Sequence, residues 1–144
     1  MRTFNLHFEG SILDENRSSL PTYSGIYLVY RGKLLLNGTI VHCNEILYIG
    51  QSDDIRRRLS VHNKRTEFLQ RIKEGEVLFY SYAKADKNDL DRIENALIYN
   101  HKPPLNDYGK DSFLYPSTEI VSDGQCALLE RDIIITATQK VDSV

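Results

Sequence analysis

The segment from Glu45 to His62 reads E-I-L-Y-I-G-Q-S-D-D-I-R-R-R-L-S-V-H, and the rest of the chain is interpreted from it. Its apolar run, Ile46 to Ile49, is too short for a helix and rich in strand-forming residues. Gly50 ends this run, and Ser52 and Asp53 then offer side-chain oxygens that could cap a helix. A strand, a glycine turn and a helix that carries cations near its start can together present positive charge to a phosphate.

The expected helix covers residues 53–73 and ends at Gly75, a good C-cap. Arg58 and His62 lie four positions apart, so they share a face of this helix beside its buried side. The apolar positions that suit one helical face are Ile55, Leu59, Phe68, Leu69 and Ile72.

A local excess of positive charge accompanies this helix. Residues 51–75 hold seven Lys or Arg against four Asp or Glu, although the whole chain has a net charge of −2. The patch is either a nucleic-acid contact or an ordinary solvated helix face, which is what most charge runs are.

Two more core strands and a second helix follow from alternation and periodicity. Residues 25–31 alternate, with Ile26, Leu28 and Tyr30 on one side and Tyr27 and Val29 on the other. A turn is expected at residues 31–33, and Asn37-Gly38 predicts a hairpin arm over residues 33–42. Residues 76–83 form the third core strand, after 25–31 and 45–49, and residues 86–101 form the second helix, capped by Asp86 or Asn88.

The two ends of the chain also contain strand patterns. Residues 1–9 alternate and predict a strand at a sheet edge, followed by a polar loop over 10–21 that has room for a short helical turn. Strands are expected over 117–123 and 128–138, and the apolar run 133–135 suggests that the last strand is covered on both faces. Residues 139–144 are expected to fray.

Composition and length narrow the class of protein. The 144 residues suit a single domain with a modest core, and the hydrophobic fraction of 41% is ordinary for a globular chain. No apolar run is long enough to span a bilayer and no signal peptide is visible, so a cytoplasmic location is expected. Cys43 and Cys126 lie far apart and are expected to be reduced thiols, and no His/Cys cluster has zinc-ligand spacing.

Two triplets, G-I-Y at residues 25–27 and Y-I-G at 48–50, make the chain resemble the GIY-YIG nuclease superfamily. The family's arginine falls ten residues after the second tyrosine, at Arg58, and its histidine one helical turn later, at His62. Its glutamate matches Glu94 in D-R-I-E-N-A-L-I, and its asparagine matches Asn106 in K-P-P-L-N. The resemblance covers residues 24–107, leaving 1–23 as an N-terminal strand and loop and 108–144 as a C-terminal β extension.

This resemblance implies a mixed α/β (α+β) fold. A small mixed or antiparallel sheet of three core strands, flanked by helices, is extended by the strands at the two chain ends. Twenty residues separate Tyr27 from Tyr48, more than the short hairpin of the commonest family pattern, and the excess is interpreted as the inserted arm.

The resemblance also implies roles for five residues. Glu94 would bind Mg²⁺ or Mn²⁺, since a carboxylate is a hard oxygen ligand, and Arg58 would donate to the scissile phosphate. Tyr27 would act as the base with Tyr48 as its helper, and His62 would take a proton from a tyrosine or orient it. The alternatives are a surface acid at Glu94, a solvent-facing histidine at His62, and two tyrosines that are ordinary core aromatics.

Further residues are expected to bind the substrate. Gly50, Gln51 and Ser52 would lie in the turn at the site, although Gln51 replaces a lysine found in several family members. Arg56 and Arg57 would contact the phosphate backbone or be solvated. Asn106 would tie its turn to the site, help to fix a tyrosine, or simply form an Asx turn after two prolines.

The function expected from these residues is a metal-dependent endonuclease acting on nucleic acid, with DNA expected over RNA. The alternative is a nucleic-acid-binding or protein-interaction module that keeps the nuclease fold without cutting. Because family enzymes often carry a separate recognition domain, specificity would come from a DNA structure, a homodimer or a separate partner.

Overall fold

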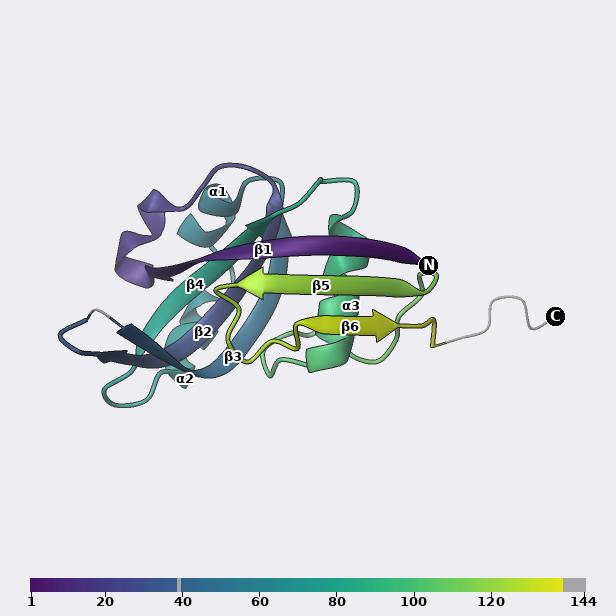
Figure 1. The fold of residues 1–144 in the computed structure, drawn as a ribbon. Coiled ribbons are helices and arrows are strands. Elements are labelled where there is room, and N and C mark those ends of the chain that lie inside the picture. Colours follow the sequence, from purple (N-terminus) through teal and green to yellow (C-terminus); the bar gives the residue numbers. More distant parts are fainter. Residues whose placement is uncertain (39, 139–144) are drawn as a thin grey trace.

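The computed structural model describes residues 1–38 and 40–138. Among these residues, six strands form one sheet in the order β3-β2-β4-β1-β5-β6 (Figure 1). The elements in chain order are β1 (Arg2–Leu13), the 3-10 helix η1 (Asp14–Ser19), β2 (Gly25–Leu35), β3 (Ile40–Ser52), α1 (Ile55–Ser60), α2 (Arg65–Arg71), β4 (Val77–Lys84), α3 (Leu90–His101), β5 (Thr118–Gly124) and β6 (Asp132–Ile135).

The predicted fold class is confirmed. The strands β2, β3 and β4 form the antiparallel centre, and β1 and β5 pair in parallel, so the sheet is mixed. The strands from both chain ends join this sheet rather than packing elsewhere.

Both terminal strands differ in placement from the prediction. The strand β1 lies inside the sheet, hydrogen-bonded to β4 on one side and β5 on the other, so the edge position was wrong (Figure 1). Sequence alternation did not distinguish the two placements, because one buried face is common to edge and interior strands. At the opposite edge, Ile133 and Ile135 of β6 are buried but Ile134 is 57% exposed, so β6 is covered on one face only.

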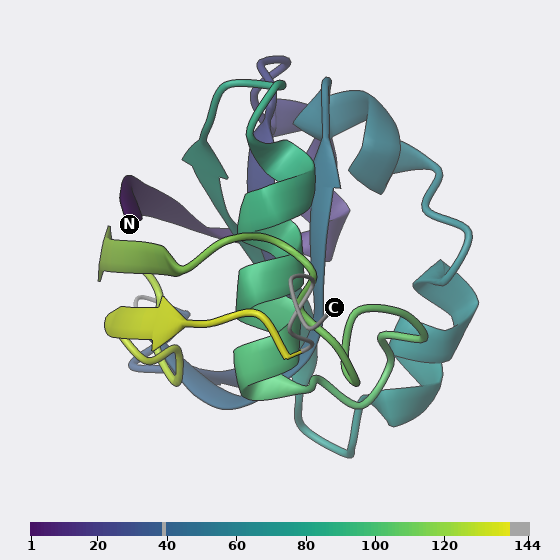
Figure 2. The same ribbon diagram turned by 90° about the vertical axis from the view of Figure 1, so that its right-hand side faces the viewer.

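The strand β2 has a core on each of its faces. Ile26, Leu28 and Tyr30 pack in the cluster that includes α3, whereas Tyr27 and Val29 pack in the cluster that includes α1 and α2. The predicted alternation is therefore confirmed. Figure 2 shows β3, the edge strand of the central sheet, lying between α3 and the α1–α2 segment.

The single helix predicted over 53–73 is two helices, α1 and α2. The helix stops at Val61, where φ is −137°, and His62 then turns inward until only 5% of it is exposed. The Nδ1 atom of His62 accepts a hydrogen bond of 3.0 Å from the backbone N–H of Lys64, which fixes the turn. Burial of this histidine causes the break between α1 and α2. Because α2 is not a continuation of α1, Leu69 lies outside the buried stripe and is 43% exposed.

The helix caps also differ from those predicted. Asp54 caps α1 by accepting from the backbone N–H of Arg57, while Ser52 exchanges hydrogen bonds with the backbone of Asp54. Asp89 precedes α3, and Asp86 instead accepts from the N–H of Asn88 one turn earlier. Polar residues crowd both helix starts, so composition alone did not identify the capping one.

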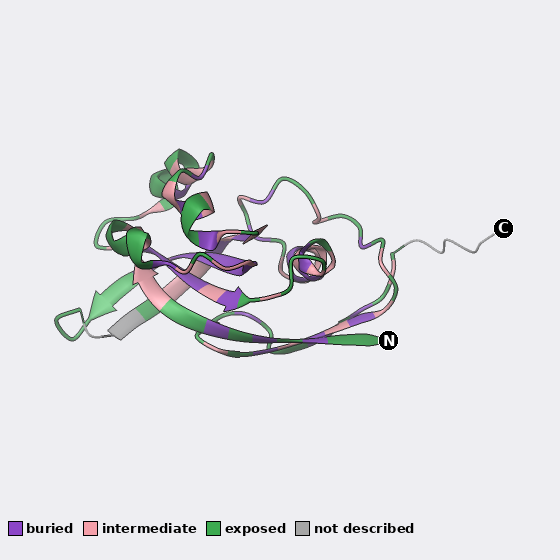
Figure 3. Ribbon diagram, turned by 90° about the horizontal axis from the view of Figure 1, so that it is seen from above, coloured by how far each residue is buried: buried purple, intermediate pink, exposed green. Residues whose placement is uncertain are grey.

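The hairpin arm forms by extension of β2 and β3. The predicted turn at residues 31–33 was wrong: the strands stay paired from Gly32 opposite Cys43 to Leu35 opposite Ile40, after register shifts on both sides of Arg31. Leu36, Asn37 and Gly38 form the described part of the tip, residues 33–38 are exposed, and this part of β2 projects from the body (Figure 3). Thr39 and the predicted frayed segment 139–144 lie outside the described residues.

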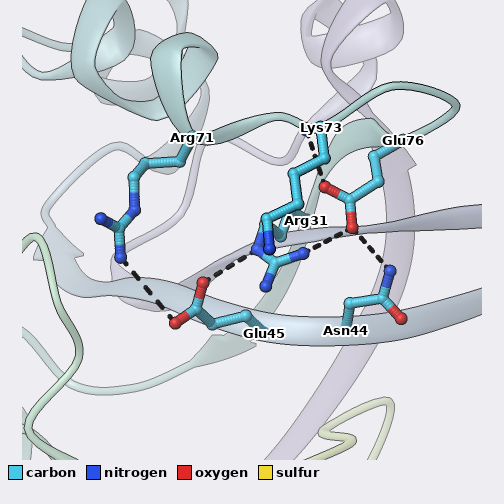
Figure 4. Close-up of polar contacts among 6 residues, drawn as sticks. All are labelled: Arg31, Asn44, Glu45, Arg71, Lys73 and Glu76. Atoms are coloured by element: carbon cyan, nitrogen blue, oxygen red, sulfur yellow. Dashed lines mark hydrogen bonds and ion pairs between the residues drawn. The ribbon is translucent and has the colours of Figure 1, made fainter.

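A network of ion pairs and hydrogen bonds holds the base of this arm (Figure 4). Arg31 of β2 donates to Glu45 of β3 at 2.9 Å and to Glu76 at 2.5 Å, and Asn44 also donates to Glu76, at 2.6 Å. Burial works to raise the pKa of Glu76, whose side chain is 3% exposed, but the donors Asn44, Lys73 N–H and Arg31 hold that pKa below its usual value. The network fixes the β2–β3 ribbon below the arm.

None of the helices in the described residues is long and apolar enough to cross a membrane.

Candidate active site

A cleft of about 480 Å³ is lined by residues of β3, α1, α3 and the loops beside them. Figure 2 shows the ribbon of β3 between α3 and the α1–α2 segment. Three elements from distant parts of the chain each contribute one of the predicted site residues: Tyr48 from β3, Arg58 from α1 and Glu94 from α3. The complete lining is Tyr48, Arg58, Asn63, Lys64, Glu94, Asn95, Ile98, Asn106, Asp107, Tyr108, Gly109, Ser112 and Leu114.

The two signature tyrosines stack side by side, with ring centroids 6.2 Å apart. Tyr27 is 1% exposed and is not among the residues that line the cleft, whereas Tyr48 is half-buried and lines it. Gly50 leaves room for Tyr27: a Cβ at position 50 would lie 2.2 Å from the ring carbon Cζ. This contact explains why glycine is needed opposite the first tyrosine.

His62 connects Tyr27 to the turn between α1 and α2. Its Nε2 lies 2.8 Å from the Tyr27 hydroxyl, and its Nδ1 accepts the N–H of Lys64. Because a backbone N–H can only donate, Nδ1 carries no proton, and a neutral ring therefore donates from Nε2 to Tyr27. Burial, with the charges of Arg58 and Lys64, lowers the pKa of His62 to about 4, so the ring is neutral at pH 7. This arrangement suits orienting the phenol better than removing its proton.

Arg58 acts on both phenols through its charge. Burial raises the pKa of Tyr48 and Tyr27, and the positive charge of Arg58 opposes both rises. A second cation, Lys64, also works to lower the pKa of Tyr48. Arg58 itself is held by Asn63, whose Oδ1 accepts from its guanidinium at 2.9 Å.

Glu94 is a mostly buried acid that lacks a strong cationic partner among the described residues. Burial raises its pKa to about 7, with Asp91 adding to the rise and Gln51 and Arg58 reducing it. The Gln51 amide donates to Asp91 and lies between the two carboxylates. A bound cation would remove the cost of ionising Glu94, so a hard divalent ion fits this position. No group of three acids, histidines or cysteines that could hold a metal occurs in residues 1–38 and 40–138, so water and substrate oxygens would complete the coordination.

Asn106 acts on the strand rather than facing the cleft freely. Its side chain accepts from the Ile49 N–H at 3.0 Å and donates to the Ile49 carbonyl at 2.9 Å, both buried. Leu105 N–H donates to Leu47 O beside it. The post-helix turn is thereby tied to β3 on both sides of Tyr48, which matches the first of the roles considered for Asn106.

Two of the predicted phosphate contacts point elsewhere. Arg56 donates to the carbonyl of Leu20 at 2.6 Å, and Arg57 pairs with Asp53 at 3.1 Å on the exposed side of α1. Neither arginine lines the cleft. Their consecutive positions on a helix rotate them away from Arg58.

Several cleft residues were not predicted as site residues. Lys64 and Asn63 lie in the α1–α2 turn, which sequence periodicity placed inside one helix. The only available signal was their position in the basic segment 51–75. The loop after Asn106 also reaches the cleft, through residues 107–109 and through Ser112 and Leu114.

One phenol, Tyr48, lines the cleft with Arg58 and the partly buried Glu94, and Tyr27 and the neutral His62 pack against Tyr48. The GIY-YIG catalytic domain family matches residues 23–108, and the chain belongs to this family of nucleases. No solved structure matches the chain with significance.

Two relatives carry the same name, UvrABC system protein C. The chain is 27% identical to the one from Fervidobacterium nodosum over 106 residues and 30% identical to the one from Pseudothermotoga lettingae over 109 residues. Each match covers 72% of this chain but only 17% and 18% of the respective relative. The chain therefore spans less than a fifth of the length of these relatives.

Gly50→Ala is expected to disorder the tyrosine pair, because the new methyl group would overlap the Tyr27 ring. Overpacking of this kind costs about 1–3 kcal/mol of unfolding free energy. Urea titration should show the loss. Gly38→Ala is a useful comparison: its Cβ would meet nothing within 4 Å, so any loss there comes from the positive φ of Gly38, a strain that Gly50 does not have. Equal stability of Gly50→Ala and wild type would contradict the packing described here.

Glu94 is expected to destabilise the metal-free protein at neutral and higher pH. Its folded pKa of about 7 lies above its unfolded value, so the folded state binds the extra proton and stability falls as pH rises from about 4.5 to 7. In EDTA at pH 8, Glu94→Gln should be more stable than wild type by about 2 kcal/mol. Mg²⁺ should raise the melting temperature of wild type but not of Glu94→Gln. Equal stability of Glu94→Gln and wild type at pH 8 in EDTA would contradict the assignment.

Proposed function

We propose that this chain is a metal-dependent endonuclease that hydrolyses phosphodiester bonds of nucleic acid, with DNA preferred over RNA. The observation that carries the proposal is the meeting of Tyr48, Arg58 and Glu94, from three separate elements, in one cleft. Family membership gives the reaction class, and the preference for DNA follows the family resemblance.

In this proposal the scissile phosphate lies against Arg58, whose planar guanidinium suits the non-bridging oxygens. A water molecule attacks phosphorus and gives its proton to the phenolate of Tyr48, while the bond to the leaving oxygen breaks. Arg58 stabilises both the phenolate and the charge that develops on the phosphoryl oxygens.

Tyr48 takes the role of base that the resemblance had given to Tyr27. Tyr48 lines the cleft, whereas Tyr27 is 1% exposed and its hydroxyl is occupied by His62. Tyr27 is instead a positioning residue: together with His62 it supports one face of the Tyr48 ring, with the His62 ring centroid 5.1 Å from that of Tyr48.

Glu94 would hold the divalent ion, Mg²⁺ or Mn²⁺. When bound there, such an ion supplies Lewis-acid stabilisation of the leaving oxygen. Gln51 donates its amide to Asp91 and works to lower the pKa of Glu94, so it acts on this carboxylate without adding charge.

The alternative function, a binding module that keeps the fold without cutting, is favoured by the absence of net positive charge on the chain. The intact set of site residues favours the enzyme. A cytoplasmic location, and specificity supplied by a homodimer or a separate partner, remain predictions.

The proposal is tested by incubating the purified protein with labelled linear duplex, branched and flapped DNA, single-stranded DNA and RNA. Each substrate is combined with Mg²⁺, with Mn²⁺ or with EDTA. We expect cutting of DNA with either metal and none in EDTA. Binding without cutting on all substrates would support the binding module instead.

A further inference from the structure

A second cation in the cleft, Lys64, is not used by the proposed chemistry. Among the described lining residues only Arg58 and Lys64 are basic. Arg58 lies beside the tyrosines, and Lys64 lies on the same wall, six residues further along the chain. The cleft therefore offers two positive charges to an anionic strand rather than one.

Lys64 is anchored in the site. Its backbone N–H donates to Nδ1 of His62, whose other nitrogen bonds Tyr27, so the lysine is positioned by the same histidine that fixes the tyrosine pair. Its side chain is only 13% exposed although it lines an open cleft. A residue held in this way differs from the solvated lysines of an ordinary helix face.

The ammonium group of Lys64 forms ion pairs with two acids whose side chains are exposed. Its Nζ lies 2.6 Å from Asp107 and 3.4 Å from Glu67, whose side chains are 62% and 51% exposed. Asp107 also lines the cleft and directly follows Asn106, the residue that ties this loop to β3. Because the Asp107 side chain is 62% exposed, its carboxylate can return to solvent when a phosphate takes its place at Lys64.

We propose that Lys64 binds a nucleic-acid phosphate neighbouring the one held by Arg58, and that Lys64 pairs with Asp107 when no nucleic acid is bound. The inference rests on the proposed function for the class of ligand. It adds a second phosphate position and a carboxylate that competes for it. The acid at the rim would also repel strands whose phosphates do not reach Lys64.

The test measures binding rather than cutting. A short labelled DNA duplex is titrated in EDTA at several salt concentrations, with wild type, Lys64→Gln, Lys64→Arg, Asp107→Asn and the control Lys73→Gln. Lys73 is exposed at the end of α2 and does not line the cleft. Losing one phosphate contact should weaken Lys64→Gln about five- to tenfold at 0.1 M salt and reduce the salt slope by about 0.9. Lys64→Arg should retain both affinity and slope.

Asp107→Asn should bind about threefold more tightly, because one competing charge is removed. The proposal thus predicts opposite effects for Lys64→Gln and Asp107→Asn. If the Lys64–Asp107 ion pair were only structural, both substitutions would break the same contact and change binding in the same direction. The inference is overturned if Lys64→Gln binds like Lys73→Gln, if both substitutions weaken binding, or if wild type does not bind the duplex. Binding by wild type without metal-dependent cutting would overturn the proposed function and leave this comparison intact.

Discussion

Tyr48→Phe is expected to slow single-turnover cleavage by about 10²–10⁴-fold, the usual contribution of a positioned general base. The substitution removes the proton acceptor and keeps the ring, so substrate binding should change little. Rates are measured at saturating protein with a labelled duplex. Two matched variants separate the role of a general base from that of a supporting ring. Tyr27→Phe should lower the cleavage rate less than Tyr48→Phe does. Tyr82→Phe should cut like wild type, because Tyr82 lies in β4 and outside the cleft.

The pH dependence checks the same role. Burial raises the pKa of Tyr48 above its ordinary value near 10, so the reactive phenolate is a small fraction at pH 7 and grows about tenfold per pH unit. Wild-type cleavage should therefore rise steadily from pH 7 to 9, and this rise should be lost in Tyr48→Phe. A larger loss in Tyr27→Phe, with the pH slope kept in Tyr48→Phe, would return the base to Tyr27.

Glu94→Gln is expected to reduce Mg²⁺-dependent cleavage by at least about 10³-fold, because several kcal/mol of charge stabilisation at the leaving oxygen are lost with the metal. The substitution keeps the shape and the hydrogen-bonding capacity of the side chain but removes its charge. Duplex binding in EDTA should stay within about threefold of wild type, since Glu94 repels rather than attracts phosphate.

The matched control for Glu94 is Asp91→Asn. Asp91 lies one helical turn away on α3, shares the Gln51 amide and is exposed. If any acid on this part of α3 could hold the metal, both substitutions would lower the rate. We expect Asp91→Asn to cut within about threefold of wild type, because Asp91 is exposed and does not line the cleft. Equal losses would contradict a role specific to Glu94.

Local sequence patterns predicted the centre of the fold well. The alternation at residues 25–31 placed Ile26 and Tyr27 in opposite cores, and both lie there. These patterns succeed because each depends on which face of one element is buried, and that is encoded within the element. The triplet spacing likewise indicated the family that the comparison confirms.

The errors came from long-range contacts. Burial of His62 ends α1 after six residues, and no periodicity in residues 53–73 indicates that the helix breaks there. The internal position of β1 depends on pairing with β5, more than a hundred residues later in the chain. Such pairings are fixed by the assembled sheet, because the edge and interior positions bury the same side-chain face.

The site showed the same division. The family resemblance implied Tyr48, Arg58 and Glu94, and these three meet in the cleft, whereas Arg56 and Arg57 turn away from it because they lie on other faces of α1. Lys64 was hidden inside an expected helix, and its position near the tyrosines depends on the turn that His62 creates.

The most direct test of the account is the cleavage of a labelled DNA substrate by the wild-type protein in Mg²⁺, after removal of the metal with EDTA, and again after Mg²⁺ is restored. Binding of the same DNA is measured in parallel in EDTA. The site described here predicts cutting in Mg²⁺, none in EDTA and full recovery. Cutting that is indifferent to EDTA would contradict the role of Glu94, and stable binding without any cutting would contradict the nuclease itself.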